Sequence, residues 1–245
     1  MAATPKVIAV TGASRGIGAA IARELAARGH LVACLSRKGL GPEDGRPVPG
    51  ALLLACDVDD EAARRGALAA VVARFGRLDG LVNNAGLHLE RPSHSCPTAD
   101  FAAVMLTNVT AVFALCREAH PHLVAAGGGL IVNIGSFFDK LGVRYTAAYS
   151  ASKAAVGALT RTLAVEWARQ NIRVLNVAPG FVATDLNRAY MEQESFRQFL
   201  KARIPVGGPA EAEEIGRFVA LAFAEDFPHW TGETLYVDGG QAISQ

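Results

Sequence analysis

Short runs of apolar, often β-branched residues alternate along this chain with longer, alanine-rich segments in which apolar residues recur at helical spacing. The short runs predict seven strands, over Lys6–Val10, Leu31–Leu35, Ala51–Ala55, Gly80–Val82, Leu130–Ile134, Arg173–Val177 and Leu235–Val237. The longer segments predict helices over Ile17–Arg28, Asp60–Phe75, Phe101–Ala125, Ala147–Gln170 and Ala210–Ala224. Strands that are apolar throughout are typical of a parallel sheet covered on both faces. We therefore predict an α/β fold with a doubly wound, mostly parallel, seven-stranded sheet.

Two segments interrupt this alternation. Residues 38–50 stand where a crossover helix is expected, and their glycines and prolines disfavour a helix. Residues 181–204 are polar and aromatic and follow the sixth predicted strand, where insertions often cover a ligand crevice, so we predict a substrate lid there. Because no repeat, low-complexity segment or linker divides the chain, we expect a single domain over residues 1–245.

Composition and charge exclude several classes of protein. The 245 residues are 51% hydrophobic, with 24 basic and 23 acidic side chains, which argues against disorder and against nucleic acid as a partner. The four cysteines form no CxxC pair, so we expect reduced thiols. The start lacks the features of a signal peptide, and the apolar run Phe101–Cys116 is too short and too polar to span a bilayer. We expect a cytoplasmic protein without a membrane partner.

A glycine-rich sequence, TGASRGIG at residues 11–18, follows the first predicted strand and opens the first predicted helix. Glycines permit a tight turn close to a pyrophosphate, and a helix amino end supplies N–H donors to phosphate. Glycines alone are common in turns, and here the flanking strand and helix favour a dinucleotide site. Asp57-Val58 and residues 83–86 (NNAG) end the third and fourth strands at the same sheet edge. A helix-capping aspartate or an asparagine-rich turn would explain either motif alone.

Four further residues form a candidate catalytic set. Tyr149 and Lys153 are four apart, on one face of a predicted helix. Ser136 ends the fifth strand 13 residues before Tyr149, and Asn108 precedes Ser136 by 28 residues within an apolar helix. A surface pair would account for Tyr149 and Lys153 alone, but not for these intervals. Tyr145 fits neither interval, and we expect it in a pocket wall or on the surface.

In this order the motifs resemble the short-chain dehydrogenase/reductase family from Val7 to Gly240. The matching segments are TGASRGIG at 11–18, DV at 57–58, NNAG at 83–86, Asn108, IGS at 134–136, YSASK at 149–153, PGFVAT at 179–184 and YVDGG at 236–240. The resemblance is greatest to bacterial 3-oxoacyl-[acyl-carrier-protein] reductases and carbonyl reductases. It implies a Rossmann-type fold, a nicotinamide cofactor, and a homodimer or homotetramer joined through the helices Phe101–Ala125 and Ala147–Gln170.

The resemblance also implies residue roles. Tyr149 would donate a proton to the substrate carbonyl oxygen, with its pKa lowered by Lys153 and the oxidised nicotinamide. Lys153 would also bind the nicotinamide ribose, Ser136 would hydrogen-bond the carbonyl oxygen, and Asn108 would hold a water of a proton relay. The implied cofactor-binding residues are Gly12, Ser14, Arg15, Gly16, Ile17, Gly18, Ser36, Arg37, Asp57, Val58, Asn84, Ala85, Gly86, Tyr149, Lys153, Pro179, Gly180, Val182 and Thr184. No metal is expected, because no histidine–cysteine spacing suits one.

The second predicted strand indicates which nicotinamide is used. It is followed by Ser36, Arg37 and Lys38, with no acidic residue to bond a ribose 2′-hydroxyl. Arg15, in the glycine-rich turn, lies on the same side. We therefore expect NADPH in preference to NAD, with a 2′-phosphate bound by Arg15, Ser36 and Arg37. The alternative, in which these are only solvated loop charges, stays open.

The substrate is indicated less sharply. Seven residues could line its entrance or could pack the lid onto the core: Phe137, Phe138, Tyr145, Phe181, Tyr190, Met191 and Phe196. Residues 125–129 and 169–171 lack basic side chains apart from Arg169, which argues against docking of an acidic acyl carrier protein. We therefore expect reduction of a small-molecule ketone or an acyl thioester. The alternatives are an NAD-linked alcohol or sugar dehydrogenase, and a non-catalytic, nucleotide-sensing Rossmann protein.

Overall fold

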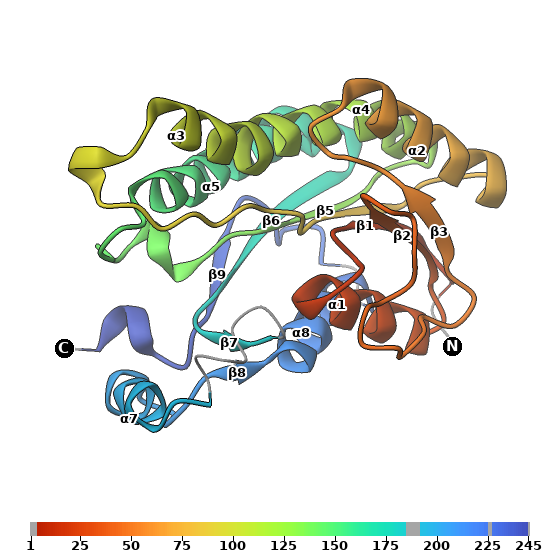
Figure 1. The fold of residues 1–245 in the computed structure, drawn as a ribbon. Coiled ribbons are helices and arrows are strands. Elements are labelled where there is room, and N and C mark those ends of the chain that lie inside the picture. The colour runs from red at the N-terminus through yellow and green to blue at the C-terminus, as the bar shows by residue number, and fades with distance from the viewer. Residues whose placement is uncertain (1–3, 185–191, 225–226, 245) are drawn as a thin grey trace.

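The centre of the molecule is a seven-stranded sheet in the spatial order β3-β2-β1-β4-β5-β6-β9 (Figure 1). The computed structural model describes residues 4–184, 192–224 and 227–244. The strands are β1 (Val7–Thr11), β2 (Leu31–Ser36), β3 (Leu52–Ala55), β4 (Gly80–Asn83), β5 (Gly129–Ile134), β6 (Ile172–Pro179) and β9 (Thr234–Val237). Every neighbouring pair is parallel. The predicted doubly wound fold is confirmed, with each strand within two residues of its predicted bounds.

Helices cover both faces of the sheet (Figure 1). On one face lie α1 (Gly16–Ala27) and α8 (Ala212–Ala224), and on the other α2 (Glu61–Phe75), α4 (Ala111–Ala125) and α5 (Ala147–Trp167). Successive residues of a strand point to opposite faces, so Ile8 and Val10 join the core under α1 and α8, whereas Val7 and Ala9 join the core under α2 and α4. Burial on both faces explains why the strands contain no polar alternation.

The predicted helix Phe101–Ala125 is longer than expected and interrupted. It consists of α3 (Thr98–Met105), a π-helical turn (Leu106–Thr110) and α4, so that Asn108 lies in the π turn. The whole stretch, Thr98–Ala125, has 28 residues, and its best window has a mean hydropathy of 1.7. Length and composition alone would let this helix cross a membrane, which corrects the expectation that the segment is too short and too polar. In the structure it lies over the sheet beside α2 and α5 (Figure 1).

The two interrupting segments differ from each other. Residues 38–50 contain no helix, as predicted, and the Glu43 N–H donates to the Ser14 carbonyl at 2.8 Å. The segment predicted to form a lid (residues 181–204) contains β7 (Val182–Ala183) and α7 (Glu194–Arg203), neither of which was predicted from the sequence. β7 pairs with β8 (Ala210–Glu211), so α8 begins two residues after the predicted start at Ala210. Tyr190 and Met191 lie outside the described residues.

Candidate active site

The glycine turn (residues 11–18) is fixed by the loop that follows β4. The Thr11 hydroxyl accepts from the backbone N–H groups of Asn84 and Ala85, both at 3.0 Å. The Asn84 side-chain amide in turn donates to the carbonyls of Thr11 at 3.0 Å and of Gly12 at 3.2 Å. These contacts bring the first and fourth strand ends together, as the sequence predicted. Thr11 itself was not singled out, although it opens the motif.

Two positions in this turn require glycine. Gly12 has φ +64°, and a Cβ there would lie 2.9 Å from the Ala85 Cα. A Cβ on Gly18 would lie 2.3 Å from the Gly12 carbonyl oxygen. Both are far inside van der Waals contact, so the turn can close only without side chains at these positions. Ile17, between them, is half-buried and packs on the core.

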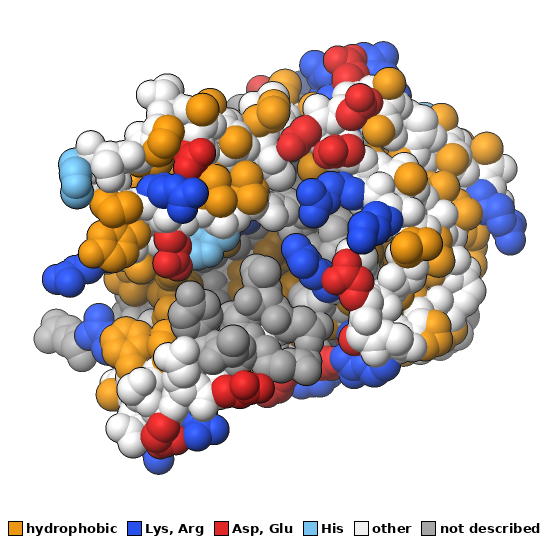
Figure 2. All heavy atoms as spheres, in the orientation of Figure 1, with side chains coloured by type: hydrophobic (Ala, Val, Ile, Leu, Met, Phe, Trp, Pro, Cys, Tyr) orange, Lys and Arg blue, Asp and Glu red, His pale blue; other side chains and the backbone are white. Residues whose placement is uncertain are grey.

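The carboxyl end of β2 lies directly beside the glycine turn. The Ala13 N–H donates to the Leu35 carbonyl at 3.2 Å, which places Ser36 and Arg37 next to the turn. Ser36 is buried, and its hydroxyl has no hydrogen-bond partner among the described residues. Arg15 and Arg37 are both exposed. Figure 2 shows Lys and Arg side chains gathered on this face near α1.

The segment 179–184 runs from the end of β6 toward the same turn. Pro179 is the last residue of β6, and a Cβ on Gly180 would lie 2.8 Å from the Asp238 Cα. Val182 is buried in β7, and the Thr184 methyl lies against Gly16, where a Cβ would approach it to 3.4 Å. Thr184, the last of the predicted cofactor-binding residues in this segment, therefore lies opposite the amino end of α1.

The four predicted catalytic residues are brought together at the ends of β4 and β5. The Ser136 side chain interacts with the Tyr149 phenol and favours its ionised form, which lowers the Tyr149 pKa. The Lys153 ammonium donates to the Ile134 carbonyl at 2.7 Å and lies 5.4 Å from the Tyr149 ring centroid. A Cβ on Gly86 would lie 3.9 Å from the Lys153 Nζ. The NNAG loop therefore borders the lysine.

Asn108 ties two elements of this site together. It is buried, its Oδ1 accepts from the Leu87 N–H at 2.7 Å, and its Nδ2 donates to the Leu87 carbonyl at 2.9 Å. The same Nδ2 donates to the Ser152 hydroxyl at 3.0 Å, and Ser152 donates to the Tyr149 carbonyl at 2.7 Å. Ser152 was not singled out from the sequence, although it is the second serine of YSASK.

Burial dominates the pKa values of the site. It raises the pKa of Tyr149 to about 12, and the hydrogen bond with Ser136 offsets only part of that rise. It lowers the pKa of Lys153 to about 8, because the ammonium loses water. We expected Lys153 to help lower the tyrosine pKa. In the protein without cofactor, burial acts in the opposite direction, and the Lys153 ammonium donates to the Ile134 carbonyl.

Aromatic rings extend from Tyr149 to the segment predicted to form a lid. Phe138 lies 5.8 Å from Tyr149 between ring centroids, Phe137 lies 5.4 Å from Phe181, and Phe181 lies 6.0 Å from Phe196. Phe137 and Phe138 are buried, so they pack against neighbouring side chains and do not line an open substrate entrance. Tyr145, which is 53% exposed, lines a separate shallow hollow with Leu89 and Cys96.

His88 is a further residue at the site that the sequence did not indicate. Its ring centroid lies 4.5 Å from that of Tyr149, and the side chain is exposed beside it. Burial of part of the ring lowers the pKa of His88. No group of three His, Cys, Asp or Glu side chains in the described part of the chain is placed to hold a metal ion.

Comparison with known proteins decides the family. The family model described as enoyl-(acyl carrier protein) reductase matches residues 12–242. Glucose 1-dehydrogenase of Gluconobacter oxydans (strain 621H) is 37% identical over 249 residues, spanning 97% of this chain and 92% of that protein. The chain belongs to the short-chain dehydrogenase/reductase family. It is therefore an oxidoreductase of a family that uses a nicotinamide dinucleotide.

Other members of the short-chain dehydrogenase/reductase family are similar in sequence and structure. A tropinone reductase homolog of Arabidopsis thaliana is 34% identical over 98% of this chain and 93% of its own length. A gluconate 5-dehydrogenase from Burkholderia cenocepacia J2315, solved in complex with NADP and tartrate, superposes with a TM-score of 0.87. It is 32% identical, and the match covers 98% of this chain and 96% of that one.

The residues present fit a nicotinamide dinucleotide. No side chain caps the amino end of α1 within the described residues, which leaves its N–H groups available to phosphate. The glycine turn in front of it has no room for side chains at Gly12 and Gly18. The buried hydroxyl of Ser36, without a partner in the described structure, adds a donor beside this turn.

Proposed function

We propose that this short-chain dehydrogenase/reductase is an NADPH-dependent carbonyl reductase that acts on ketones or 3-oxoacyl thioesters. The observation that carries the proposal is the assembly of Ser136, Tyr149 and Lys153 at the sheet edge where the glycine turn ends. A site that only senses a nucleotide has no need of an acid and a hydrogen-bond donor facing one point. Within this proposal the chain is a single domain, residues 181–204 form the lid, and the enzyme is cytoplasmic.

The protein groups supply an acid at the reacting oxygen. When bound, reduced nicotinamide supplies the hydride, and negative charge then develops on the carbonyl oxygen. Tyr149 donates its phenolic proton to that oxygen, and Ser136 donates a hydrogen bond to it. With its pKa raised to about 12, Tyr149 is fully protonated at neutral pH, which suits a proton donor. The Lys153 ammonium favours the tyrosinate that is left after proton transfer.

Asn108 has a positioning role in this proposal. Its side-chain amide is occupied by Leu87 and Ser152, so it holds the loop after β4 against the helix that carries Tyr149. Lys153 returns a proton to Tyr149 after each turnover, and water held near Asn108 connects the lysine to solvent. This relay stays a proposal, as the family resemblance implies it.

The preference for NADPH is supported by Arg15, in the glycine turn, and by Arg37, which follows the buried Ser36, with no acidic residue at the end of β2. A 2′-phosphate pairs with such guanidinium groups. Fluorescence titration with NADPH and NADH tests this point, and we expect NADPH to bind at least about tenfold more tightly, or about 1.4 kcal/mol. Equal affinity, or tighter binding of NADH, would overturn the cofactor assignment.

An NAD(P)-linked sugar or alcohol dehydrogenase is the second candidate function. The similarity of the chain to glucose 1-dehydrogenase and to gluconate 5-dehydrogenase favours it. Oxidation of an alcohol needs tyrosinate as the base, and burial of Tyr149 opposes that form. Assays of reduction and of oxidation separate the candidates. Reduction is measured with aromatic ketones, quinones and 3-oxoacyl-CoA esters, and oxidation with glucose and gluconate. Faster oxidation of the sugars would favour the second candidate.

The substrate side of the proposal rests on the aromatic rings between Tyr149 and Phe196, which favour an apolar or acyl group next to the carbonyl. Docking of acyl carrier protein is not part of the proposal, because residues 125–129 carry no charge. We further propose that the protein is a homo-oligomer, a dimer or a tetramer. Neither nucleic acid nor a membrane is a partner.

A further inference from the structure

The turn formed by residues 57–59 lies at the adenosine end of the proposed cofactor site. The nicotinamide must approach Tyr149, beside β5, and a 2′-phosphate must approach Arg37, after β2. β3 pairs with β2 on the side away from β5. The residues that follow β3 therefore lie farther from Tyr149 than Arg37 does, on the side where a bound dinucleotide would place its adenine ring. The turn has an exposed Asp57, whose Oδ1 accepts from the Asp59 N–H at 3.1 Å. Its next residue, Val58, is buried.

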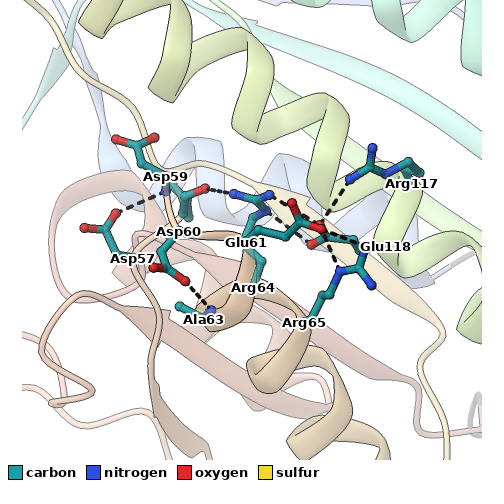
Figure 3. A network of polar contacts seen from close by, with 10 residues as sticks. Asp57, Asp59, Asp60, Glu61, Ala63, Arg64, Arg65, Arg117 and Glu118 are labelled. Carbon is teal, nitrogen blue, oxygen red and sulfur yellow. Dashed lines mark hydrogen bonds and ion pairs between the residues drawn. The ribbon is translucent and has the colours of Figure 1, made fainter.

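Arg64 of α2 holds one side of this turn (Figure 3). Its Nη1 donates to the Val58 carbonyl at 2.8 Å, while its Nε and Nη2 donate to the Glu118 carboxylate of α4 at 3.2 and 3.3 Å. The Arg64 and Glu118 side chains are only 7% and 6% exposed. The planar guanidinium therefore joins α2, α4 and the backbone of the turn in one buried arrangement.

Thr107 holds the other side. Its hydroxyl donates to Asp59 Oδ2 at 2.8 Å, and Thr107 precedes Asn108 in the π turn. The start of α2 needs neither contact, because Asp60 caps it by accepting from the Ala63 N–H at 2.6 Å. The turn is thus attached by two side chains from elements that are distant in sequence.

We propose that Arg64 and Thr107 are positioning residues that orient the 57–59 turn to bind the adenine ring of the dinucleotide. This rests on the proposed function, because it assumes the dinucleotide site. A buried ion pair adds little net stability compared with apolar side chains of similar volume. Its contribution here is geometric, since Arg64 fixes the direction of the Val58 carbonyl and hence of the peptide groups that face the adenine.

The experiment replaces the pair without leaving a lone buried charge. The double variant R64M/E118L keeps apolar volume between α2 and α4 but removes the bond to the Val58 carbonyl. T107V removes only the hydroxyl. The control is R65Q, because Arg65 is on the same helix and also approaches Glu118, at 4.0 Å, but is 63% exposed and lies off the turn. Thermal unfolding first establishes that each variant is folded.

Each variant is titrated with NADPH, with 2′,5′-ADP as the adenosine half and with reduced nicotinamide mononucleotide as the other half. We expect R64M/E118L and T107V to bind 2′,5′-ADP about five- to twentyfold more weakly than the wild type does, a loss of the size expected for one or two hydrogen bonds. The loss of affinity for 2′,5′-ADP should be at least about fivefold larger than the loss for the mononucleotide. R65Q should match the wild type. An equal loss for both fragments, or no loss, would overturn this inference alone. Failure of wild-type protein to bind NADPH, NADH or either fragment would overturn the proposed function together with it.

Discussion

At the scale of single residues, loss of water governs the chemistry of this site. Tyr149 and Lys153 lie in the same region, and burial favours the neutral form of each side chain. It therefore raises the pKa of Tyr149 and lowers the pKa of Lys153. The result is a tyrosine that keeps its proton until charge develops beside it, and a lysine whose proton is easily released. Both properties suit a proton donor that must be reloaded after each turnover.

Removal of the Tyr149 hydroxyl tests the acid. In Tyr149→Phe the ring contacts with Phe138 and His88 stay, so the fold and the affinity for NADPH should be nearly unchanged. The turnover number should fall by about a hundred- to ten-thousandfold, the usual contribution of general acid catalysis. Tyr145→Phe is the control, because Tyr145 is exposed in a separate hollow and its loss should be small. If Tyr145→Phe lost its activity and Tyr149→Phe kept it, the acid would have been assigned to the wrong tyrosine.

The stability of the protein should depend on pH through Lys153. The folded-state pKa, about 8, is below the ordinary value of 10.5. Between these values the unfolded chain binds more protons than the folded chain, so the free energy of unfolding contributed by Lys153 rises with pH. Below about pH 8 the buried Lys153 is charged in the folded protein, and its loss of water lowers the free energy of unfolding by the full amount. Wild-type protein should therefore gain stability relative to Lys153→Met from pH 8 to 10.5, as measured by urea unfolding. If the difference in the free energy of unfolding between the two proteins stayed constant over this range, the lowered pKa of Lys153 would be contradicted.

At the scale of elements, the glycine turn permits a sharp comparison. A methyl group at Gly18 would lie 2.3 Å from the Gly12 carbonyl oxygen and 2.4 Å from the Asn84 Nδ2. Gly18→Ala should therefore lower the free energy of unfolding by about 1–3 kcal/mol and weaken NADPH binding. Gly66→Ala is the matched control, because Gly66 lies within α2 with no atom near its Cβ position. That change should stabilise the protein by about 0.5–1 kcal/mol. Thermal unfolding and NADPH titration measure both variants.

The elements also show what the sequence could and could not predict. Strands such as β6 were predictable because burial on both faces leaves an uninterrupted apolar run. The π turn at 106–110 was not, because a shift of the backbone hydrogen bonds hardly changes the apolar spacing on either side. The helix α7 was missed because its residues are mostly exposed and polar, with only Leu200 buried.

The same limit applies to the site. Ser136, Tyr149 and Lys153 could be predicted to lie together. Tyr149 and Lys153 are one helical turn apart, and Ser136 follows a strand that ends at the same sheet edge. Thr11, Arg64 and Ser152 could not, because their partners lie far away in sequence, as Glu118 does for Arg64. A lone hydroxyl or guanidinium in a sequence does not reveal which carbonyl it will meet.

At the scale of the whole molecule, the helices above the sheet leave apolar side chains exposed. On α4 and α5 these include Phe113, which is 39% exposed, and Val165, which is 80% exposed. Only 39% of the apolar window in Thr98–Ala125 is buried. A second copy of the chain, related by a twofold axis, is the simplest cover for such a surface.

Light scattering should accordingly give at least twice the chain mass of 25.7 kDa at micromolar concentration. Phe113→Asp and Val165→Asp should each shift the protein toward the monomer, since each places a charge in the proposed interface. Leu40→Asp is the control, because Leu40 is 63% exposed in the 38–50 segment, away from these helices. A wild-type mass near that of one chain would refute the proposed oligomer.

Hydride transfer itself is the central claim, and isotope transfer tests it most directly. The protein is incubated with NADPH that carries deuterium at the transferable position of the nicotinamide, and with the panel of aromatic ketones, quinones and 3-oxoacyl-CoA esters. Mass spectrometry of the products then shows where the deuterium is found. We predict one deuterium on the former carbonyl carbon of a reduced product, from only one face of the nicotinamide, and a rate that collapses in Tyr149→Phe. Deuterium retained in the cofactor with every member of the panel, although NADPH binds, would contradict the account.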